Sequence, residues 1–396
     1  MKKAALGLLL MCCLLLTGCG GGQEIESCLF VLSMAVDPAP DGNLTVTVKA
    51  LSGTQEAVGG ASSSGQAAQQ EGDTQGAQPD GEIEQPEPGY IVMSATAPSC
   101  LRALNLLSST TPRTVNLSQL REIVISRTLA ETDATLSILR EIHGMYRANG
   151  GAIVVVTPDD AGDFIRRQRA ILGVRLSKYL EVLFDHFSQM DTIPPDAQLA
   201  SVIAAMESDT MDALAVYAAA NTFDASLVLS GGADMDRLPG HLPRTSPAEN
   251  EYLGSALFSG PRMTGTLTGE ETGLLCLMMG RAQRHAAFIG DALYRTKLPT
   301  RVRRSIGDDG TLKVHIDMLL EHVAGEEREA AAAIAAQIER EAVGVLLKLR
   351  AASCDGVGFG RIAIRQCIDI PAWEAVNWPE RYETAGVSVA ADVRIQ

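Results

Sequence analysis

Aromatic side chains are scarce in this chain of 396 residues, where Phe, Trp and Tyr together make up 4%. A core of Ala and small aliphatic side chains can fold, but it predicts no obvious aromatic wall for a ligand. Basic residues are also in deficit, because 33 Lys and Arg stand against 48 Asp and Glu and give a formal net charge of -15 at pH 7. This charge argues against a nucleic-acid partner and against electrostatic attraction to anionic lipid.

Metal-binding patterns are missing as well. No C-x-x-C pair occurs among the eight cysteines, which disfavours a zinc ribbon or a thioredoxin-like site; most are expected to be buried, and one disulfide is left open. The six histidines are scattered, and none has a second histidine four residues away or a cysteine nearby. His315 falls on the polar side of a predicted strand, where a solvated surface residue is the simplest interpretation. We therefore expect neither a metal ion nor a cofactor.

The sequence also lacks the usual catalytic motifs, with neither a G-x-S-x-G elbow nor a Walker-type phosphate loop. Acidic pairs such as Asp159-Asp160 stand at predicted helix starts, where capping explains them. The stretch CDGVGFG, from Cys354 to Gly360, looks like a dinucleotide loop, but it follows a helix instead of a strand. We interpret it as a tight turn after a helix end. These observations predict no enzyme, and a binding or scaffold protein is expected.

Beyond the first residues, no apolar run approaches the length of about 20 residues that a bilayer span needs. The first run, Ala4–Leu16, follows Lys2 and Lys3, as in the signal peptide of a secreted protein. It leads into Leu-Thr-Gly-Cys, which resembles a bacterial lipobox and predicts lipidation of Cys19 with removal of residues 1–18. The alternative is an ordinary secretory signal with an incidental cysteine. A diacylglycerol or acyl anchor would hold the protein at a membrane surface.

The order of predicted elements indicates an α/β (α+β) fold of two to three domains, in which helices flank mixed sheets. Two apolar segments, 28–37 and 43–51, predict a hairpin that is joined by turn residues. Residues 52–89 are rich in Gly, Ser, Gln, Pro and acidic side chains, so we expect a disordered insertion within the sheet. Alternating segments from Leu120 to Arg167 predict a strand-helix-strand-helix layer.

Local signals mark further element ends and the domain boundaries. The stretch TPDD predicts a helix that is capped by Thr157, and a second helix should begin with a capping box of Thr268 and Glu271. A hairpin is expected at 253–267, and the alternating segment 312–320 predicts a long strand. The predicted parts are a signal peptide (1–18), an N-terminal α/β region (19–230), a linker (231–250) and a C-terminal α/β domain (251–396).

The order of these segments is similar to that of the Ger(x)C family, the C-subunit lipoproteins of spore germinant receptors. Four stretches carry the resemblance along the chain: the lipobox with Glu24-Ile25, an apolar strand to Asp37 and Asp41-Gly42; SATAPSCLRALNLLSS with NLSQLREIVIS; ALFSGPRMTGTLTGEETGLLCLMMG; and DGVGFG with Trp373, Asn377-Trp378 and the last strand. Two features depart from the family pattern. Gly20-Gly21 replace a usual Trp-Asp or Trp-Ser pair, and the insertion is unusually long.

The resemblance implies a non-enzymatic subunit on the outer face of the spore inner membrane. Its expected partners are a polytopic A-subunit and a permease-like B-subunit that binds the nutrient. From the family, the resemblance implies one functional residue in this chain, the acylated Cys19, and no catalytic, cofactor-binding or metal-binding residue. Five further positions are marked as structural or interface candidates: Asp37, Gly42, Gly358, Gly360 and Trp378. The alternative function is a solute-binding lipoprotein of a transporter, which a ligand cleft between two lobes would favour.

Overall fold

The computed structural model describes residues 27–52, 89–145, 148–222, 237–244, 246–282, 286–289, 292–297, 300–325 and 330–396. The predicted signal peptide with Cys19, nearly all of the predicted insertion and part of the predicted linker lie outside these residues. Within the described ranges, no helix combines the length and the apolar character that a membrane crossing needs.

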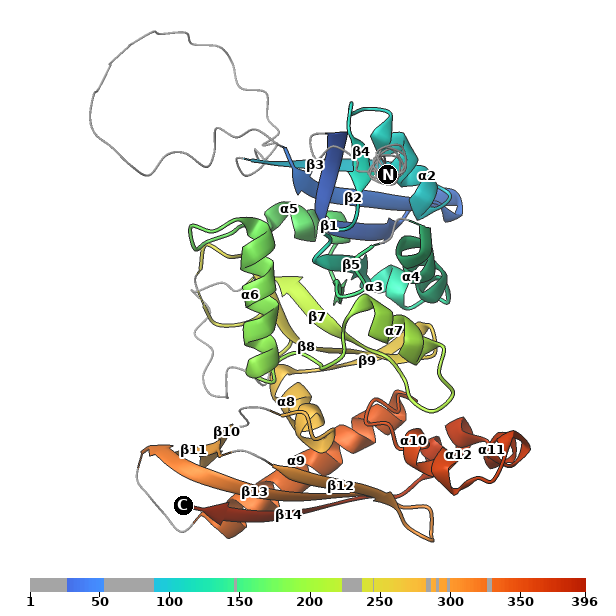
Figure 1. The fold of residues 1–396 in the computed structure, drawn as a ribbon. Coiled ribbons are helices and arrows are strands. Elements are labelled where there is room, and N and C mark those ends of the chain that lie inside the picture. Colours follow the sequence, from blue (N-terminus) through green and yellow to red (C-terminus); the bar gives the residue numbers. More distant parts are fainter. Residues whose placement is uncertain are drawn as a thin grey trace, which may run out of the picture.

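A large mixed sheet forms the first part of the molecule (Figure 1), with the strand order β3-β2-β1-β5-β6-β7-β8-β9 and a short β4 beside β1. Its strands are β1 (Cys28–Pro38), β2 (Leu44–Leu51), β3 (Tyr90–Ala97), β4 (Thr114–Asn116), β5 (Glu122–Ser126), β6 (Ile153–Thr157), β7 (Leu214–Ala220), β8 (Asn250–Ser259) and β9 (Arg262–Leu267). Strands β1, β5, β6 and β7 run parallel, and hairpins extend both edges. The predicted hairpins β1–β2 and β8–β9 are confirmed.

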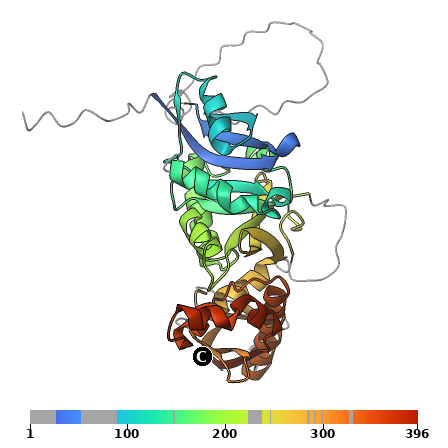
Figure 2. The same ribbon diagram turned by 90° about the vertical axis from the view of Figure 1, so that its right-hand side faces the viewer.

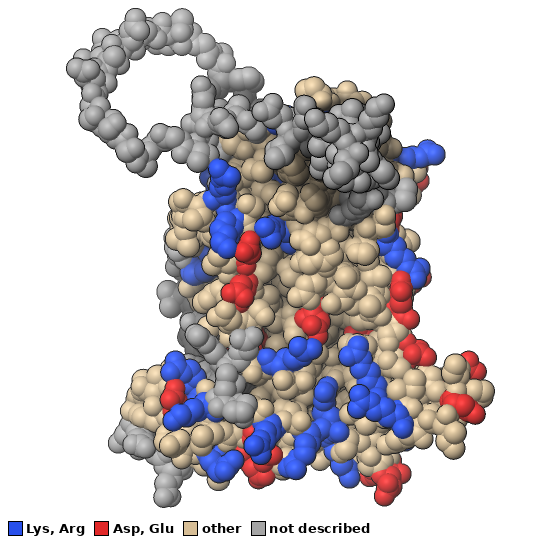
Figure 3. Space-filling model, in the orientation of Figure 1, with Lys and Arg blue, Asp and Glu red and all other residues tan. Residues whose placement is uncertain are grey.

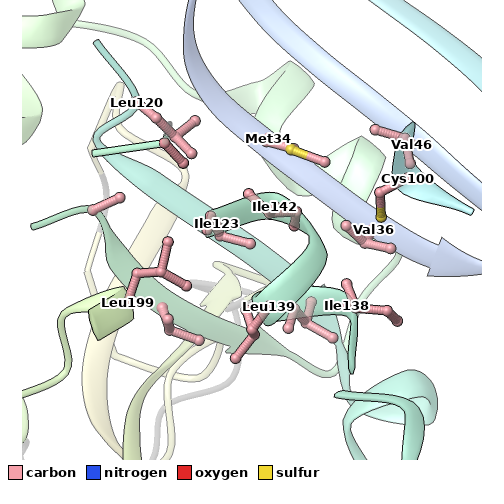
Figure 4. Close-up of a cluster of buried hydrophobic side chains, with 14 of the residues drawn as sticks. Met34, Val36, Val46, Cys100, Leu120, Ile123, Ile138, Leu139, Ile142 and Leu199 are labelled. Carbon is pink, nitrogen blue, oxygen red and sulfur yellow. The ribbon is translucent and has the colours of Figure 1, made fainter. Parts of the chain in front are cut away.

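Helices cover both faces of this sheet. One face carries α2 (Cys100–Ser108), α3 (Arg127–Ala130), α4 (Ala134–Met145) and α7 (Leu199–Met206), and the other carries α5 (Ala161–Arg167) and α6 (Leu176–Gln189). Alternate strand residues serve the two faces: Ile123 and Ile125 of β5 join the first core, while Val124 joins the second. Figure 4 shows Leu139 of α4 and Leu199 of α7 within the first core. Burial on both faces explains why the parallel strands are almost wholly apolar.

A smaller sheet forms the second part, with the order β10-β11-β13-β12 and β14 beside β13. Its elements are α8 (Gly269–Met278), β10 (Ala286–Ile289), β11 (Ala292–Thr296), β12 (Arg301–Ile306), β13 (Leu312–Ala324), α9 (Ala331–Ala351), α10 (Gly360–Ala363), α11 (Ile370–Val376), α12 (Trp378–Thr384) and β14 (Val387–Ile395). The apolar residues of β13 alternate and face α9, as in Leu312, Val314 and Ile316. The two parts are stacked along one long axis, with α8 between the large sheet and α9 (Figure 2). The predicted α/β class, with mixed sheets and flanking helices, is confirmed.

Two local predictions have different outcomes. The capping box of α8 is confirmed, because Thr268 and Glu271 exchange side-chain and backbone hydrogen bonds. The predicted cap at Thr157 is wrong, since this residue still pairs with Ser126 in the β5–β6 ladder. The cap of α5 is Asp160, which accepts the backbone N–H of Asp163 at 2.8 Å.

Strands β8 and β9 complete the large sheet. Strand β8 pairs with β7 over residues 250–257, so the large sheet runs across residue 251, where the C-terminal domain is predicted to begin. The physical reason is that the hairpin buries Leu257 and Leu267 against the C-terminal core while its backbone extends the N-terminal sheet. The division of the chain into domains stays a proposal.

Candidate functional site

Asp37 and Gly42 shape the first hairpin and its contact with α5. Asp37 is 5% exposed, and its two carboxylate oxygens accept the backbone N–H groups of Ala161 and Gly162 at 2.8 and 3.0 Å. Burial raises the pKa of Asp37, while these two donors act in the opposite direction. Gly42 follows Asp41 in the turn, and both have a positive φ, of 73° and 60°. Asp37 therefore binds the first amides of a helix far along the chain, and Gly42 permits the turn before β2.

Gly358 and Gly360 belong to a loop that encloses the carboxylate of Asp355. Asp355 is 1% exposed, and one of its oxygens accepts the backbone N–H groups of Gly358 and Phe359, both at 2.9 Å. The other oxygen accepts the N–H of Gly360 at 2.7 Å and the indole N–H of Trp378 at 3.2 Å. Gly358 has a φ of 80°, a conformation that favours glycine. The loop follows α9 directly, so the prediction of a tight turn after a helix is confirmed.

An acidic loop between α7 and β7 ties this turn to the large sheet. The carboxylate of Asp212 accepts the backbone N–H of Asp355 at 2.7 Å and that of Gly260, in the β8–β9 turn, at 3.1 Å. The carboxylate of Asp209 accepts the indole N–H of Trp373 at 2.7 Å. These contacts, together with the Asp355 loop, form a polar joint between the two parts of the molecule.

Close packing surrounds Trp378, which is 5% exposed and belongs to the C-terminal core. Its ring stacks on that of Trp373, with centroids 6.2 Å apart, and the ring of Tyr382 lies 5.9 Å away. A Cβ at Gly360 would lie 2.5 Å from the carbonyl oxygen of Thr210 and 2.7 Å from Nε1 of Trp378. Only a residue without a side chain fits there unless the neighbours move.

Burial dominates the electrostatics of this joint. It raises the pKa of Asp355 to about 7, although the N–H groups of Gly360 and Phe359 act in the opposite direction. The negative charge of Asp212 raises it further, and burial raises the pKa of Asp212 as well. The joint therefore contains two adjacent carboxyl groups that resist ionisation, the buried one of Asp355 and the half-buried one of Asp212.

A second buried polar group, which the sequence did not reveal, connects strands of the large sheet. Glu122 is fully buried and accepts hydrogen bonds from the Gln168 amide and, at 3.2 Å, from the O–H of Tyr252. The Gln168 amide also donates to the Tyr252 oxygen at 2.7 Å and accepts from Ser33 at 2.9 Å. Lys49, only 1% exposed, donates to the backbone carbonyl of Gln168. Burial raises the pKa of Glu122, and its hydrogen-bond donors act against this.

An apolar pocket adjoins this polar group. It has a volume of about 350 Å³ and lies between α6 and the segment that leads into β8. Gln168 and Tyr252 form part of its wall, together with Leu183 and Phe187. Tyr252 packs edge-to-face against Phe184, with ring centroids 5.3 Å apart. The rings of Tyr179, Phe187 and Tyr252 therefore line the pocket, which the composition alone did not predict.

His315 has acidic neighbours that its sequence position does not reveal. Its Nε2 atom lies 3.4 Å from a carboxylate oxygen of Asp317 and 3.2 Å from one of Asp392, which pairs with Asp317 across β13 and β14. The guanidinium of Arg303 lies 3.3 Å from the other oxygen of Asp317. These ligand types can bind a cation, but an ion-pair cluster also accounts for the distances. The absence of a metal ion stays a prediction.

Surface charge is unevenly distributed on this acidic chain. Figure 3 shows Lys and Arg side chains gathered over the C-terminal sheet. Arg301, Arg303 and Lys313 are exposed there on β12 and β13. The prediction of no nucleic-acid partner rests on overall charge alone and stays a prediction.

The cysteines of the described residues are free thiols: Cys28, Cys100, Cys276, Cys354 and Cys367. All but Cys367 are buried, as expected for small apolar residues. Burial raises the pKa of the Cys100 thiol to about 12. These thiols are therefore unreactive core residues, apart from the more exposed Cys367.

Comparisons with known proteins assign a family. Residues 21–220 match the family described as spore germination protein N-terminal domain, and residues 253–396 match the family described as spore germination B3/GerAC-like, C-terminal. A solved structure titled "Crystal Structure of the GerBC protein" is similar with a TM-score of 0.44 and 13% identity, over 91% of this chain and 96% of that chain. The curated proteins contain no match. Because the two family matches together span most of the sequence, the resemblance is confirmed, and the chain belongs to the GerAC-like family of spore germination proteins.

Proposed function

We propose that this chain is a non-enzymatic lipoprotein subunit of a nutrient germinant receptor, acting at the spore inner membrane. The observation that carries the proposal is the match of both spore germination domains, in order, to residues 21–220 and 253–396. The lipobox supports the anchor, in which a diacylglycerol or acyl group on Cys19 holds the chain on the outer face of the membrane.

The proposed partners are a polytopic A-subunit and a permease-like B-subunit that binds the nutrient. The shape of the chain supports an arrangement in which the membrane holds only one end. Strand β1, which follows the anchor segment, belongs to the part farther from the C-terminal sheet (Figure 1). The rest of the molecule then extends away from the anchor, where its surfaces can contact other subunits.

A ligand cleft between two lobes would favour the alternative, a solute-binding lipoprotein. The apolar pocket is not such a cleft, because all of its lining residues lie between positions 168 and 253, in the large-sheet part. The junction with the C-terminal part is instead filled by α8 and by the polar joint around Asp355. The geometry therefore favours a subunit of an assembly.

The test is affinity isolation of the tagged chain from spore inner membranes after mild cross-linking. The proposal predicts co-isolation of one polytopic protein and one permease-like protein of the same receptor. Co-isolation with the membrane and nucleotide-binding subunits of a transporter would instead establish the alternative. A tagged lipoprotein of unrelated fold from the same membrane serves as the control.

A further inference from the structure

The pocket beside α6 is a hollow that is partly open to solvent. It has a volume of about 350 Å³, which lies within the range of small-molecule sites. Its wall is mostly apolar, so an apolar occupant gains dispersion contacts and removes apolar surface from water.

The wall defines the chemistry of the occupant. Aliphatic and aromatic side chains of α6, among them Leu180, Leu183 and Phe187, face the segment around Tyr252 and Leu253. This wall supplies ring faces and branched carbons, which suit aromatic or branched aliphatic groups.

Several polar groups in the pocket wall already have partners within the chain, whereas the buried side-chain oxygen of Asn250 has no hydrogen-bond partner among the described residues. The Tyr252 hydroxyl donates to Glu122, and the Gln168 amide donates to Glu122 and Tyr252. At the rim, the guanidinium of Arg244 pairs with Glu251 at 2.7 Å, and Glu251 is buried. An occupant with a net charge would have to displace these contacts, so an uncharged occupant is favoured.

Part of the pocket wall is exposed to solvent. Met190, which directly follows α6, lines the pocket and is 43% exposed. A partly exposed apolar side chain in the wall of an apolar pocket is typical of a site that admits an apolar molecule from solution.

We propose that this pocket binds an uncharged, apolar small molecule that carries an aromatic ring or a branched aliphatic group. The site is separate from the lipid anchor and does not depend on the receptor assignment. Its polar floor, made by Gln168 and Tyr252, is held rigid by Glu122 and is pre-formed for the ligand.

The probe for the test is N-phenyl-1-naphthylamine, an uncharged molecule with two aromatic ring systems, whose fluorescence rises in apolar surroundings. It is titrated into the full chain carrying Cys19→Ala, so that no acyl group or detergent competes. We expect saturable binding with one site per chain. Leu183→Trp fills the pocket and should weaken binding about tenfold or more, a loss of about 1.4 kcal/mol. The matched control is Val182→Trp, on the same helix at a position that is 53% exposed, and its affinity should equal that of the parent chain.

A second measurement serves if Leu183→Trp fails to fold. Methyl NMR of the unaltered pocket should show probe-induced shifts at Leu180, Leu183 and Met190, with the methyl groups of the C-terminal core unchanged. Absence of saturable binding would overturn the proposal, as would equal binding by the Leu183→Trp and Val182→Trp chains. A competing occupant is the apolar stretch Leu227–Leu229, which lies outside the described residues. If Leu227→Ser with Leu229→Ser strengthens probe binding, the chain fills its own pocket and the proposal is wrong.

Discussion

The indole N–H of Trp378 donates to the buried carboxylate of Asp355 at 3.2 Å. The same carboxylate accepts three backbone N–H groups, and the backbone N–H of Asp355 in turn donates to Asp212, in the loop before β7 of the large sheet. One side chain thus organises the loop after α9 and lies at the joint between the two parts of the molecule. Its removal should therefore have effects well beyond a surface substitution.

The substitution Asp355→Asn should lower the free energy of unfolding by about 3 kcal/mol, because the new amide group would face N–H donors that now have an acceptor. Urea unfolding of the two chains measures the difference. The control is Asp308→Asn, an exposed position in the β12–β13 turn, where less than about 0.5 kcal/mol is expected. Equal stability of the Asp355→Asn chain and the parent would show that the carboxylate does not organise the joint.

Stability should depend on pH through the same residue. Burial raises the pKa of Asp355 from 3.8 to about 7 in the folded chain. Between these values the folded chain keeps a proton that the unfolded chain has released, so the free energy of unfolding falls as the pH rises. From pH 5 to pH 8 the loss due to Asp355 should be about 3 kcal/mol. Higher stability at pH 8 than at pH 5 would contradict this, and the slope should shrink in the Asp355→Asn chain.

The close approach at Gly360 gives an independent test of the joint. Gly360→Ala would place a Cβ 2.5 Å from the Thr210 carbonyl oxygen, and we expect a loss of about 3 kcal/mol. The control is Gly344→Ala in α9, where no atom lies within 4 Å and the change should stabilise the chain by about 0.5–1 kcal/mol. Thermal unfolding of both variants and of the parent chain measures these differences in stability. Similar thermal midpoints for Gly360→Ala and Gly344→Ala would show that the loop around Gly360 can move to accept a Cβ without loss of stability.

The lipid anchor predicts where the chain is found in cells. Cys19→Ala removes the only thiol at the predicted lipobox, so the variant should move from the membrane fraction to the soluble fraction. Fractionation with an antibody against the chain measures this. Cys28→Ala, at the start of β1, is the control and should leave the chain in the membrane fraction. Full membrane retention of the Cys19→Ala chain would remove the lipoprotein assignment.

Much of the fold could be predicted from local patterns. The β1–β2 hairpin follows from alternating apolar residues and a turn that contains Asp41 and Gly42. The capping box at Thr268 follows from spacing alone. These features depend on residues that are close in the sequence, so a single chain reveals them.

The joint and the pocket could not be predicted because they depend on distant contacts. Asp355 meets Asp212 only after the two parts pack, and Lys49 reaches Gln168 only after α5 covers β2. The one local sign was a charged residue inside an apolar strand, as in Glu122 of EIVIS. A charge that is buried on a central strand needs partners, and such a position marks a site to examine.

Germination of spores that lack the gene for this chain tests most directly whether the chain is a subunit of a nutrient germinant receptor. Such spores are exposed to a panel of amino acids and sugars, with dodecylamine as a trigger that bypasses nutrient receptors, and are complemented with the parent chain or with Cys19→Ala. If the chain is such a subunit, we expect these spores to lose the response to some nutrients and to keep a normal response to dodecylamine. The parent chain should restore germination fully, and the Cys19→Ala chain should restore it less. A normal response to every nutrient, in a strain without other receptors of this kind, would contradict it.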